Sequence, residues 1–299
     1  MKTIALIGLG VISEHYLYAL ENNQNFLLTA VADLNETSAS RNLYKKYPFY
    51  TDYKQMIREK RPDFVLIATP PKTHYQIATD ALNLGVSVIS EKPAVLTLTD
   101  YDALISLASQ KGLIYEVMYH WQHGNEILAF EEIYNSKKIT EISVYINDDY
   151  SDGNGSIKQE RQGLAGVWFD SGINALSMVK RLINFENAKV IKAQKVKCKT
   201  SGAPIFCHVE LDLDGIKTVI EIDWQHRQSE KYTEIVYDGA KMLLHNGEQR
   251  IYYQGKITNA DHSPRLPSHY YNYFNTFKGG TAKENRILQQ LLLSVDSLL

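Results

Sequence analysis

Cysteine is scarce in this sequence of 299 residues, which holds only Cys198 and Cys207. Two cysteines cannot build the disulfide framework of a small secreted domain, and their separation does not match the spacing of a metal site. Both fall in segments that we expect to form neighbouring strands, so a disulfide between those strands is the alternative to two reduced thiols. Reduced thiols favour a cytoplasmic protein.

Long apolar runs and an excess of one charge are also absent. No run approaches the ~20 apolar residues that span a bilayer, and the N-terminus lacks the apolar stretch and cleavage site of a signal peptide. Lys and Arg number 32 and Asp and Glu 34, a net charge of −2, without the basic excess that nucleic-acid binders show. We therefore expect a cytoplasmic globular protein with neither a membrane nor a nucleic acid as partner.

The first 120 residues alternate short apolar strands with helices. A strand that is apolar throughout is typical of a parallel sheet with helices on both faces, and this alternation predicts a doubly wound α/β domain. The expected strands lie at 3–7, 27–32, 64–68, 86–90 and 113–118. The expected helices lie at 13–21, 37–47, 74–84 and 99–110.

After residue 120 the pattern changes to consecutive strands with tight turns. Such a run predicts an α+β domain with a large, open and mostly antiparallel sheet. Its strands are expected at 141–147, 189–199, 206–212, 217–224, 233–237, 241–245 and 250–253. Its helices are expected at 126–136, 172–182, 269–277 and 284–298.

We therefore predict two domains, 1–120 and 121–299, with the last helix packing back on the first. In the strand 217–224, Ile220, Ile222 and Trp224 alternate with acidic residues, which predicts one apolar and one acidic face. Because an open sheet of mixed polarity commonly pairs by two-fold symmetry, we predict a homodimer formed through the second domain.

A glycine-containing turn joins the first strand to the first helix. Its sequence, Gly8-Leu9-Gly10-Val11-Ile12-Ser13, approximates the dinucleotide motif G-x-G-x-x-G with serine in the third position. Glycines permit the tight turn and allow backbone N–H groups to approach a pyrophosphate at the N-terminus of the helix. The motif predicts a dinucleotide site, and an ordinary turn between strand and helix is the alternative.

Asp33 ends the second strand, where a carboxylate accepts hydrogen bonds from an adenosine ribose. A carboxylate also repels the 2′-phosphate of NADP. No basic residue follows closely, Glu36 adds a second negative charge, and the first cation downstream is Arg41. We therefore predict that NAD is preferred to NADP, with an aspartate that only caps a turn as the alternative.

Two further polar segments directly follow predicted parallel strands. Thr69, Pro70 and His74 come after the strand 64–68, and Glu91-Lys92-Pro93 comes after the strand 86–90. Open α/β sheets bind ligands at the carboxyl ends of their strands. Lys92 at this edge can act in proton transfer, although a solvated loop lysine and a surface histidine are the ordinary alternatives.

Three motifs in order, Gly-x-Gly-x-x-Ser, Thr69-Pro70-Pro71-x-x-His74 and Glu91-Lys92-Pro93, resemble those of the glucose–fructose oxidoreductase, inositol dehydrogenase and rhizopine-catabolism (Gfo/Idh/MocA) family of NAD(P)-dependent sugar oxidoreductases. The resemblance implies a Rossmann domain followed by a substrate domain with a large open sheet, and it implies that Lys92 acts at the substrate carbinol. The cofactor-binding residues that it implies are Gly8, Gly10, Val11, Ile12, Asp33, Thr69, Pro70, His74, Glu91 and Lys92.

The segment Asp170-Ser171-Gly172-Ile173-Asn174 departs from the commonest form of the family, because Asn174 stands where many relatives carry histidine. This form resembles the branch of D-galactose and L-arabinose 1-dehydrogenases, which implies that Asp170 and Asn174 serve catalysis and sugar binding. It also implies a sugar-binding role for His120 and for Trp224, with Trp224 as a wall of the site. We expect Asp149 to orient the sugar hydroxyls together with His120 and Asn174.

The residues themselves allow other interpretations. Asp170 and Asn174 are four apart and share a face if a helix begins there, but Asp170 would equally suit an N-cap with Asn174 on the surface. Trp224 would suit a sheet core. No His, Cys and Glu residues have zinc-like spacing, so we expect no metal.

Together these features predict a dehydrogenase that oxidises the anomeric carbinol of an aldose to its lactone. The catalytic residues would be Lys92, Asp170 and Asn174, the cofactor NAD or NADP, and the partner a small sugar. The alternatives are oxidation of another sugar or polyol carbinol, as in inositol dehydrogenases, and a regulatory protein that binds cofactor or sugar without turnover.

Overall fold

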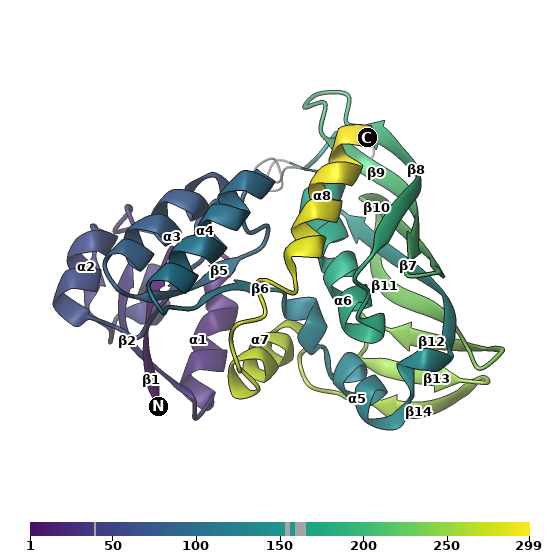
Figure 1. Ribbon diagram of the computed structural model, residues 1–299, viewed down its shortest axis with the longest axis horizontal. Helices are drawn as coiled ribbons and strands as arrows, with labels where there is room; N and C mark the ends of the chain where they lie inside the picture. Colours follow the sequence, from purple (N-terminus) through teal and green to yellow (C-terminus); the bar gives the residue numbers. More distant parts are fainter. Residues whose placement is uncertain (39, 153–155, 159–165) are drawn as a thin grey trace. The chain divides into compact units, whose positions relative to one another are not determined.

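The computed structural model describes residues 1–38, 40–152, 156–158 and 166–299. The chain divides into two compact units, each with its own sheet (Figure 1). The first unit comprises Met1–His120 with Leu266–Arg286, and the second comprises Trp121–Arg265 with Ile287–Leu299. No helix of the described residues combines the length and the apolar character needed to cross a membrane.

The first unit contains a parallel sheet of six strands in the order β3-β2-β1-β4-β5-β6. The order reverses between β1 and β4, so the carboxyl ends of these two strands flank the crevice in which such sheets bind ligands. The strands are β1 (Lys2–Ile7), β2 (Phe26–Ala32), β3 (Phe49–Tyr50), β4 (Phe64–Ile67), β5 (Ser87–Glu91) and β6 (Tyr115–Met118). Every residue of β4 and β5 is buried, as expected for strands with both faces covered.

Among the described residues, five α-helices belong to this part of the fold. They are α1 (Ser13–Asn22), α2 (Tyr53–Lys60), α3 (His74–Asn83), α4 (Leu98–Gln110) and α7 (Arg265–Asn275). Two of them begin at a capping side chain: Asp52 accepts a hydrogen bond from the N–H of Lys54 before α2, and Thr97 accepts one from Asp100 before α4. The expected helix over 37–47 is only a 3₁₀ turn at Arg41–Tyr44.

The helix that returns to the first unit is α7, not the last helix. Tyr270 and Phe274 of α7 join Tyr16 and Phe26 in one apolar cluster against β1, β2 and β4. The last helix, α8 (Arg286–Leu298), groups with the second unit, where Trp168 Nε1 donates a hydrogen bond to the carbonyl oxygen of Leu292 at 2.9 Å. The expectation for the last helix was therefore wrong, because both C-terminal helices carry an apolar face and the sequence does not say which sheet each face meets.

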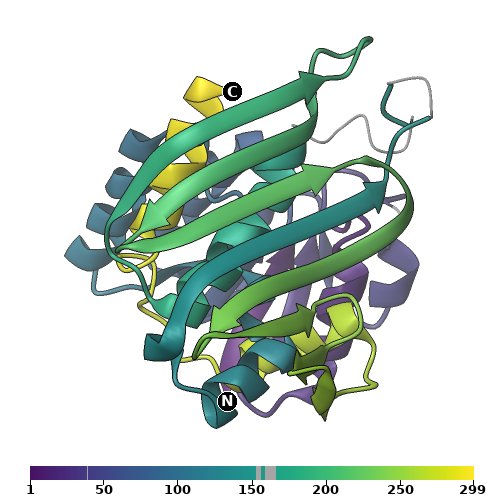
Figure 2. The same cartoon turned by 90° about the vertical axis from the view of Figure 1, so that its right-hand side faces the viewer.

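The second unit contains an eight-stranded sheet in the order β14-β13-β12-β11-β7-β10-β9-β8, in which only β7 and β10 pair in parallel (Figure 2). The strands are β7 (Ile139–Asp149), β8 (Ala188–Lys197), β9 (Pro204–Leu213), β10 (Ile216–Asp223), β11 (Gln225–Tyr237), β12 (Ala240–His245), β13 (Arg250–Tyr253) and β14 (Lys256–Ala260). Positive φ angles at Asp214 and Gly215, and at Asp238 and Gly239, form two of the tight turns that join these strands.

Helices α5 (Asn125–Ile133) and α6 (Ile173–Ile183) pack on this sheet, which turns its other face toward the viewer in Figure 2. The expected alternation along β10 is present: Ile220 and Ile222 are fully buried, whereas Glu221 and Asp223 are partly exposed. The sequence therefore predicted the two faces of this strand correctly.

Candidate functional site

The glycine turn after β1 is tightly enclosed at its first residue. Gly8 has a φ of +100°, and its N–H donates to the carbonyl oxygen of Ala32 at 2.8 Å. A Cβ at this position would lie 2.6 Å from the carbonyl oxygen of Ala68. Both the backbone angle and the close approach of the chain after β4 therefore require glycine here.

The second half of the turn is open. Nothing lies within 4 Å of the position where a Cβ of Gly10 would be, and Val11 is 71% exposed. Among the described residues, the N–H groups of Gly10, Val11 and Ile12 donate no hydrogen bond, and no side chain caps α1. Free N–H groups at the positive end of a helix dipole suit an anion, so the turn fits the pyrophosphate of a dinucleotide.

Asp33 is held in place by the backbone on both sides. Its Oδ2 accepts a hydrogen bond from the N–H of Leu9 at 2.7 Å, and its Oδ1 accepts one from Asn35 at 2.8 Å. The carboxylate is half-buried at the end of β2, so it both braces the glycine turn and keeps lone pairs for further donors. Arg41 lies over the ring of Phe49, with 4.4 Å between its guanidinium carbon and the ring centroid.

His74 links the two polar segments that follow β4 and β5. Its Nε2 lies 2.7 Å from the carbonyl oxygen of Thr69, and its Nδ1 lies 3.0 Å from that of Pro93. The ring is buried, which excludes the surface role that was the alternative for this histidine. His74 thus fixes the backbone of both segments, including that around Thr69 and Pro70.

Glu91 ends β5 with its carboxylate directed into the protein. The side chain is 5% exposed, and Oε1 accepts hydrogen bonds from the hydroxyls of Tyr16 and Tyr270, the latter at 3.2 Å. Oε2 accepts the N–H of Lys92 at 2.9 Å. Lys92 itself is half-buried and is followed by a cis peptide bond to Pro93.

His120 follows β6 and is also buried. Its ring stacks on that of Tyr270 at 5.1 Å, and its Nδ1 lies 3.3 Å from Nδ1 of His269. The sequence did not mark Tyr16, Tyr270 or His269, because nothing in the helices that carry them indicates that they meet Glu91 and His120.

One edge of the parallel sheet therefore carries all the predicted residues of the first unit. The glycine turn, Asp33, Thr69, Lys92 and His120 follow β1, β2, β4, β5 and β6 in turn. Because parallel strands end at the same edge, the structure brings these residues to the side of the sheet at which dinucleotides bind.

In the second unit, Asp170 lies on a π-helical turn, Trp168–Gly172, that leads into α6, and Asn174 lies in the first turn of α6. Asn174 Nδ2 donates to the carbonyl oxygen of Asp170 at 3.1 Å, so the two residues share a face as expected. The N-cap of α6 is Gly172, with no side-chain hydrogen bond, which excludes Asp170 as that cap. A single π turn inside a helix is frequent at functional sites.

Asn174 is 9% exposed, and its Oδ1 is buried without a hydrogen-bond partner among the described residues. A buried amide oxygen without a donor costs free energy, so this atom is suited to a donor from a ligand. Gly172 allows the turn to form, because a Cβ there would lie 2.4 Å from the indole of Trp168.

Asp149 and Trp224 lie differently from the other predicted residues. Asp149 is exposed at the end of β7, and its Oδ2 lies 2.8 Å from the ammonium of Lys158. Trp224 is 0% exposed, with its Nε1 3.4 Å from Ser171 Oγ and its ring 5.2 Å from that of Tyr150. Its burial favours the core alternative, so its role as a sugar wall stays a prediction.

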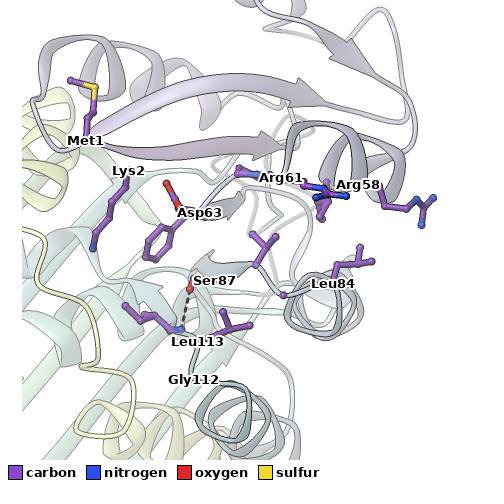
Figure 3. Close-up of a pocket in the computed structure, with 15 residues that line it drawn as sticks. Met1, Lys2, Arg58, Arg61, Asp63, Leu84, Ser87, Gly112 and Leu113 are labelled. Carbon is purple, nitrogen blue, oxygen red and sulfur yellow. Dashed lines mark hydrogen bonds between the residues drawn. The ribbon is translucent and has the colours of Figure 1, made fainter.

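The cavity shown in Figure 3 lies at the opposite edge of the parallel sheet, near the start of β1 and β5. It measures about 940 Å³ and is lined by Lys2, Arg58, Asp63 and Ser87 among others, none of them a predicted site residue. Helices α2, α3 and α4 end there, and their terminal carbonyl groups disfavour an anion. Across the described ranges, no group of three His, Cys, Asp or Glu side chains is placed to hold a metal ion.

Residues 2–119 match the model of GFO_IDH_MocA, the oxidoreductase family with an NAD-binding Rossmann fold. This part of the chain is similar to that family. The sheet order and the glycine turn agree with the match, since both are those of a dinucleotide-binding domain.

Curated relatives extend the likeness beyond the first unit. The D-apiose dehydrogenase of Paraburkholderia graminis is 22% identical over 250 residues, 80% of this chain and 66% of that protein. The scyllo-inositol 2-dehydrogenase (NADP(+)) IolW of Bacillus subtilis is 20% identical over 175 residues, 56% of this chain and 48% of that protein. The chain thus spans less than two thirds of the length of these relatives.

Solved structures share the fold over the whole chain. An oxidoreductase from Agrobacterium radiobacter, in complex with NAD⁺, L-tartaric acid and magnesium, has a TM-score of 0.82 at 15% identity and covers 100% of this chain and 99% of its own. The D-galactose-1-dehydrogenase of Rhizobium etli has a TM-score of 0.74 at 24% identity. This match covers 98% of this chain and 88% of the dehydrogenase. At these identities the likeness establishes the fold, including the large antiparallel sheet of the second unit.

Proposed function

We propose that this protein is an NAD-dependent dehydrogenase that oxidises the anomeric carbinol of an aldose to a lactone. The observation that carries the proposal is the placement of Lys92 at the sheet edge that also holds the open glycine turn. Asn174 at the start of α6 supports it, because this residue offers a buried amide oxygen to a polar ligand beside Asp170 of the π turn. The match of residues 2–119 to a family with an NAD-binding Rossmann fold supports NAD as the cofactor.

The cofactor would be held by the residues that the first unit gathers at this edge. The N–H groups after Gly10 would bind the pyrophosphate, and Asp33 would accept hydrogen bonds from the adenosine ribose. Thr69 and Pro70 would line the path toward the nicotinamide, and the buried His74 would hold the backbone around them. When bound, NAD⁺ supplies the hydride acceptor.

Lys92 would take the proton of the C1 hydroxyl as the hydride leaves the same carbon. Asp170 would assist by hydrogen bonding to that hydroxyl, and Asn174 and His120 would orient the ring hydroxyls. The proton and the hydride leave together, so the carbinol becomes the carbonyl of a lactone. Holding both reactants in this geometry would supply much of the rate.

A second candidate is oxidation of another carbinol of a sugar or polyol. The names of two relatives favour it, since one is a D-apiose dehydrogenase and the other a scyllo-inositol dehydrogenase. The burial of Trp224 favours it as well, because that residue was part of the resemblance to aldose 1-dehydrogenases.

A panel of aldoses and polyols tests both candidates. Each compound is incubated with the protein and either NAD⁺ or NADP⁺, and the absorbance of the reduced cofactor is followed. Turnover of an aldose with release of a lactone supports the proposal, and turnover of inositols or other polyols alone supports the second candidate. Tight NAD⁺ binding without turnover of any compound would refute a dehydrogenase and leave the regulatory alternative.

A further inference from the structure

The buried carboxylate of Glu91 is held by two tyrosines from opposite ends of the chain. Tyr16 of α1 and Tyr270 of α7 are both fully buried, and both donate to the same oxygen, Oε1. Their rings meet edge to face with 4.7 Å between centroids. With both donors on Oε1, the other oxygen is directed at the N–H of Lys92.

Tyr270 also contacts two histidines through its ring. His15 of α1 stacks on it at 5.9 Å and 5° between the ring planes, and His120 stacks on it at 5.1 Å and 19°. The next residue before it, His269, meets His120 through their Nδ1 atoms. One helix from the C-terminal part of the chain therefore contacts two predicted site residues, His120 and the Glu91 that precedes Lys92.

We propose that Tyr270 is a positioning residue of the dehydrogenase site, an inference that rests on the function proposed above. Its hydroxyl fixes the Glu91 carboxylate, which in turn fixes the backbone from which Lys92 projects. Its ring fixes the plane of His120. The two roles use different parts of one side chain, so substitutions can separate them.

The physical reason is the cost of leaving a buried carboxylate short of donors. Without the Tyr270 hydroxyl, Oε1 accepts a hydrogen bond from Tyr16 alone. The Glu91 carboxylate then lowers its free energy by turning toward another hydrogen-bond donor. Such a turn would release the N–H of Lys92 and widen the range of positions that its ammonium samples. Small losses of orientation at a reacting group reduce the rate more than they reduce ligand binding.

Tyr270→Phe removes the hydroxyl and keeps the ring. We expect kcat to fall about three- to tenfold, the change that the loss of one such hydrogen bond gives, with the Kd for NAD⁺ and the sugar KM within about twofold of wild type. Tyr270→Leu also removes the stacking on His120, so it should raise the sugar KM in addition.

Tyr101→Phe is the matched control. Tyr101 is equally buried in the same unit, and its hydroxyl donates to the carbonyl oxygen of Ala282 at 2.8 Å. Both Phe variants should lose similar thermal stability, but only Tyr270→Phe should lose kcat. Equal losses of kcat in the two variants, or a wild-type kcat in Tyr270→Phe, would overturn the inference.

A second readout needs no substrate. Reductive methylation followed by mass spectrometry measures how fast each lysine reacts in the folded protein. We expect Tyr270→Phe to change the rate at Lys92 about threefold or more, with Lys2 and Lys111 of the same unit unchanged. If the wild type turns over no sugar, an altered Lys92 rate still supports the positioning role while the proposed function fails, and an unaltered rate refutes the role.

Discussion

Removing the charge of Asp33 tests which cofactor this site prefers. The Asp33 carboxylate is half-buried beside the open turn, and its oxygens accept the N–H groups of Leu9 and Asn35. Asp33→Ala would also deprive Leu9 of its acceptor and disturb the glycine turn. Asp33→Asn is the better variant, because its amide oxygen can still accept from Leu9 while the negative charge is lost.

The size of the preference follows from the charges. Two like unit charges about 4 Å apart repel by about 4 kcal/mol at an effective dielectric constant of about 20. Solvent and salt reach the half-exposed Asp33, so we expect about 1–3 kcal/mol against NADP⁺. This corresponds to a ratio of about 5- to 150-fold in kcat/KM in favour of NAD⁺. Asp33→Asn should bring the ratio close to one.

The assay measures kcat/KM for both cofactors at saturating substrate in wild type and variants. Glu36→Gln is the control, because it removes an exposed carboxylate three positions further along and should change the ratio less than about twofold. Arg41→Ala tests the first cation that follows Asp33 in the sequence, which lies over Phe49. The reasoning is wrong if wild type prefers NADP⁺ and Arg41→Ala abolishes that preference, or if Asp33→Asn leaves the ratio unchanged.

Four further predictions follow from the same structure. Lys92→Ala should lose most of its turnover and keep the Kd for NAD⁺, measured by protein fluorescence; a wild-type kcat would contradict its role in proton transfer. Asn174→Ala should weaken sugar binding at least as much as turnover, and an unchanged sugar KM would remove Asn174 from the site. Burial raises the pKa of Glu126 above its usual 4.5, opposed in part by a hydrogen bond from Asn246. Because the pKa of Glu126 is raised in the folded state, its contribution to stability is present below the unfolded pKa and is lost as the pH rises through the folded pKa. The melting temperature of Glu126→Gln should therefore gain on that of wild type as the pH rises above 4.5, and a constant difference would contradict this. Light scattering should give about twice the chain mass of 34.1 kDa at micromolar concentration, and a value near one chain mass would refute the homodimer.

The sequence predicts those helices and strands whose apolar residues recur at regular spacing and are buried in the structure. The strand expected at 250–253 has those bounds in β13, and the strands of the parallel sheet lie within a residue or two of their expected positions. The elements that were missed are short or polar. β3 has two residues, β14 is an exposed edge strand, and α2 buries only Met56 and Ile57. Asp52 before α2 was the one local signal that could have revealed it.

The candidate site is predictable where its residues follow strand ends. The placement of Asp33, Thr69 and Lys92 at one edge was predictable because a parallel sheet brings successive strand ends together, and the strands themselves were recognisable. The π turn at Trp168–Gly172 was not predicted, since its form depends on the Trp168 ring packing against Gly172. Tyr270 was missed because its contacts with Glu91 join positions 179 residues apart.

The predicted site residues are divided between the two units. Variants can therefore separate the contribution of cofactor binding from that of sugar binding. The glycine turn, Asp33 and Lys92 belong to the unit for which we propose dinucleotide binding, whereas Asp170 and Asn174 belong to the other. If cofactor and sugar are bound by different units, Asp33→Asn should change only the cofactor constants and Asn174→Ala mainly the sugar constants. A combined variant should then show additive losses, because residues without shared partners act independently, whereas strong non-additivity would mean that both residues depend on one shared arrangement of the site.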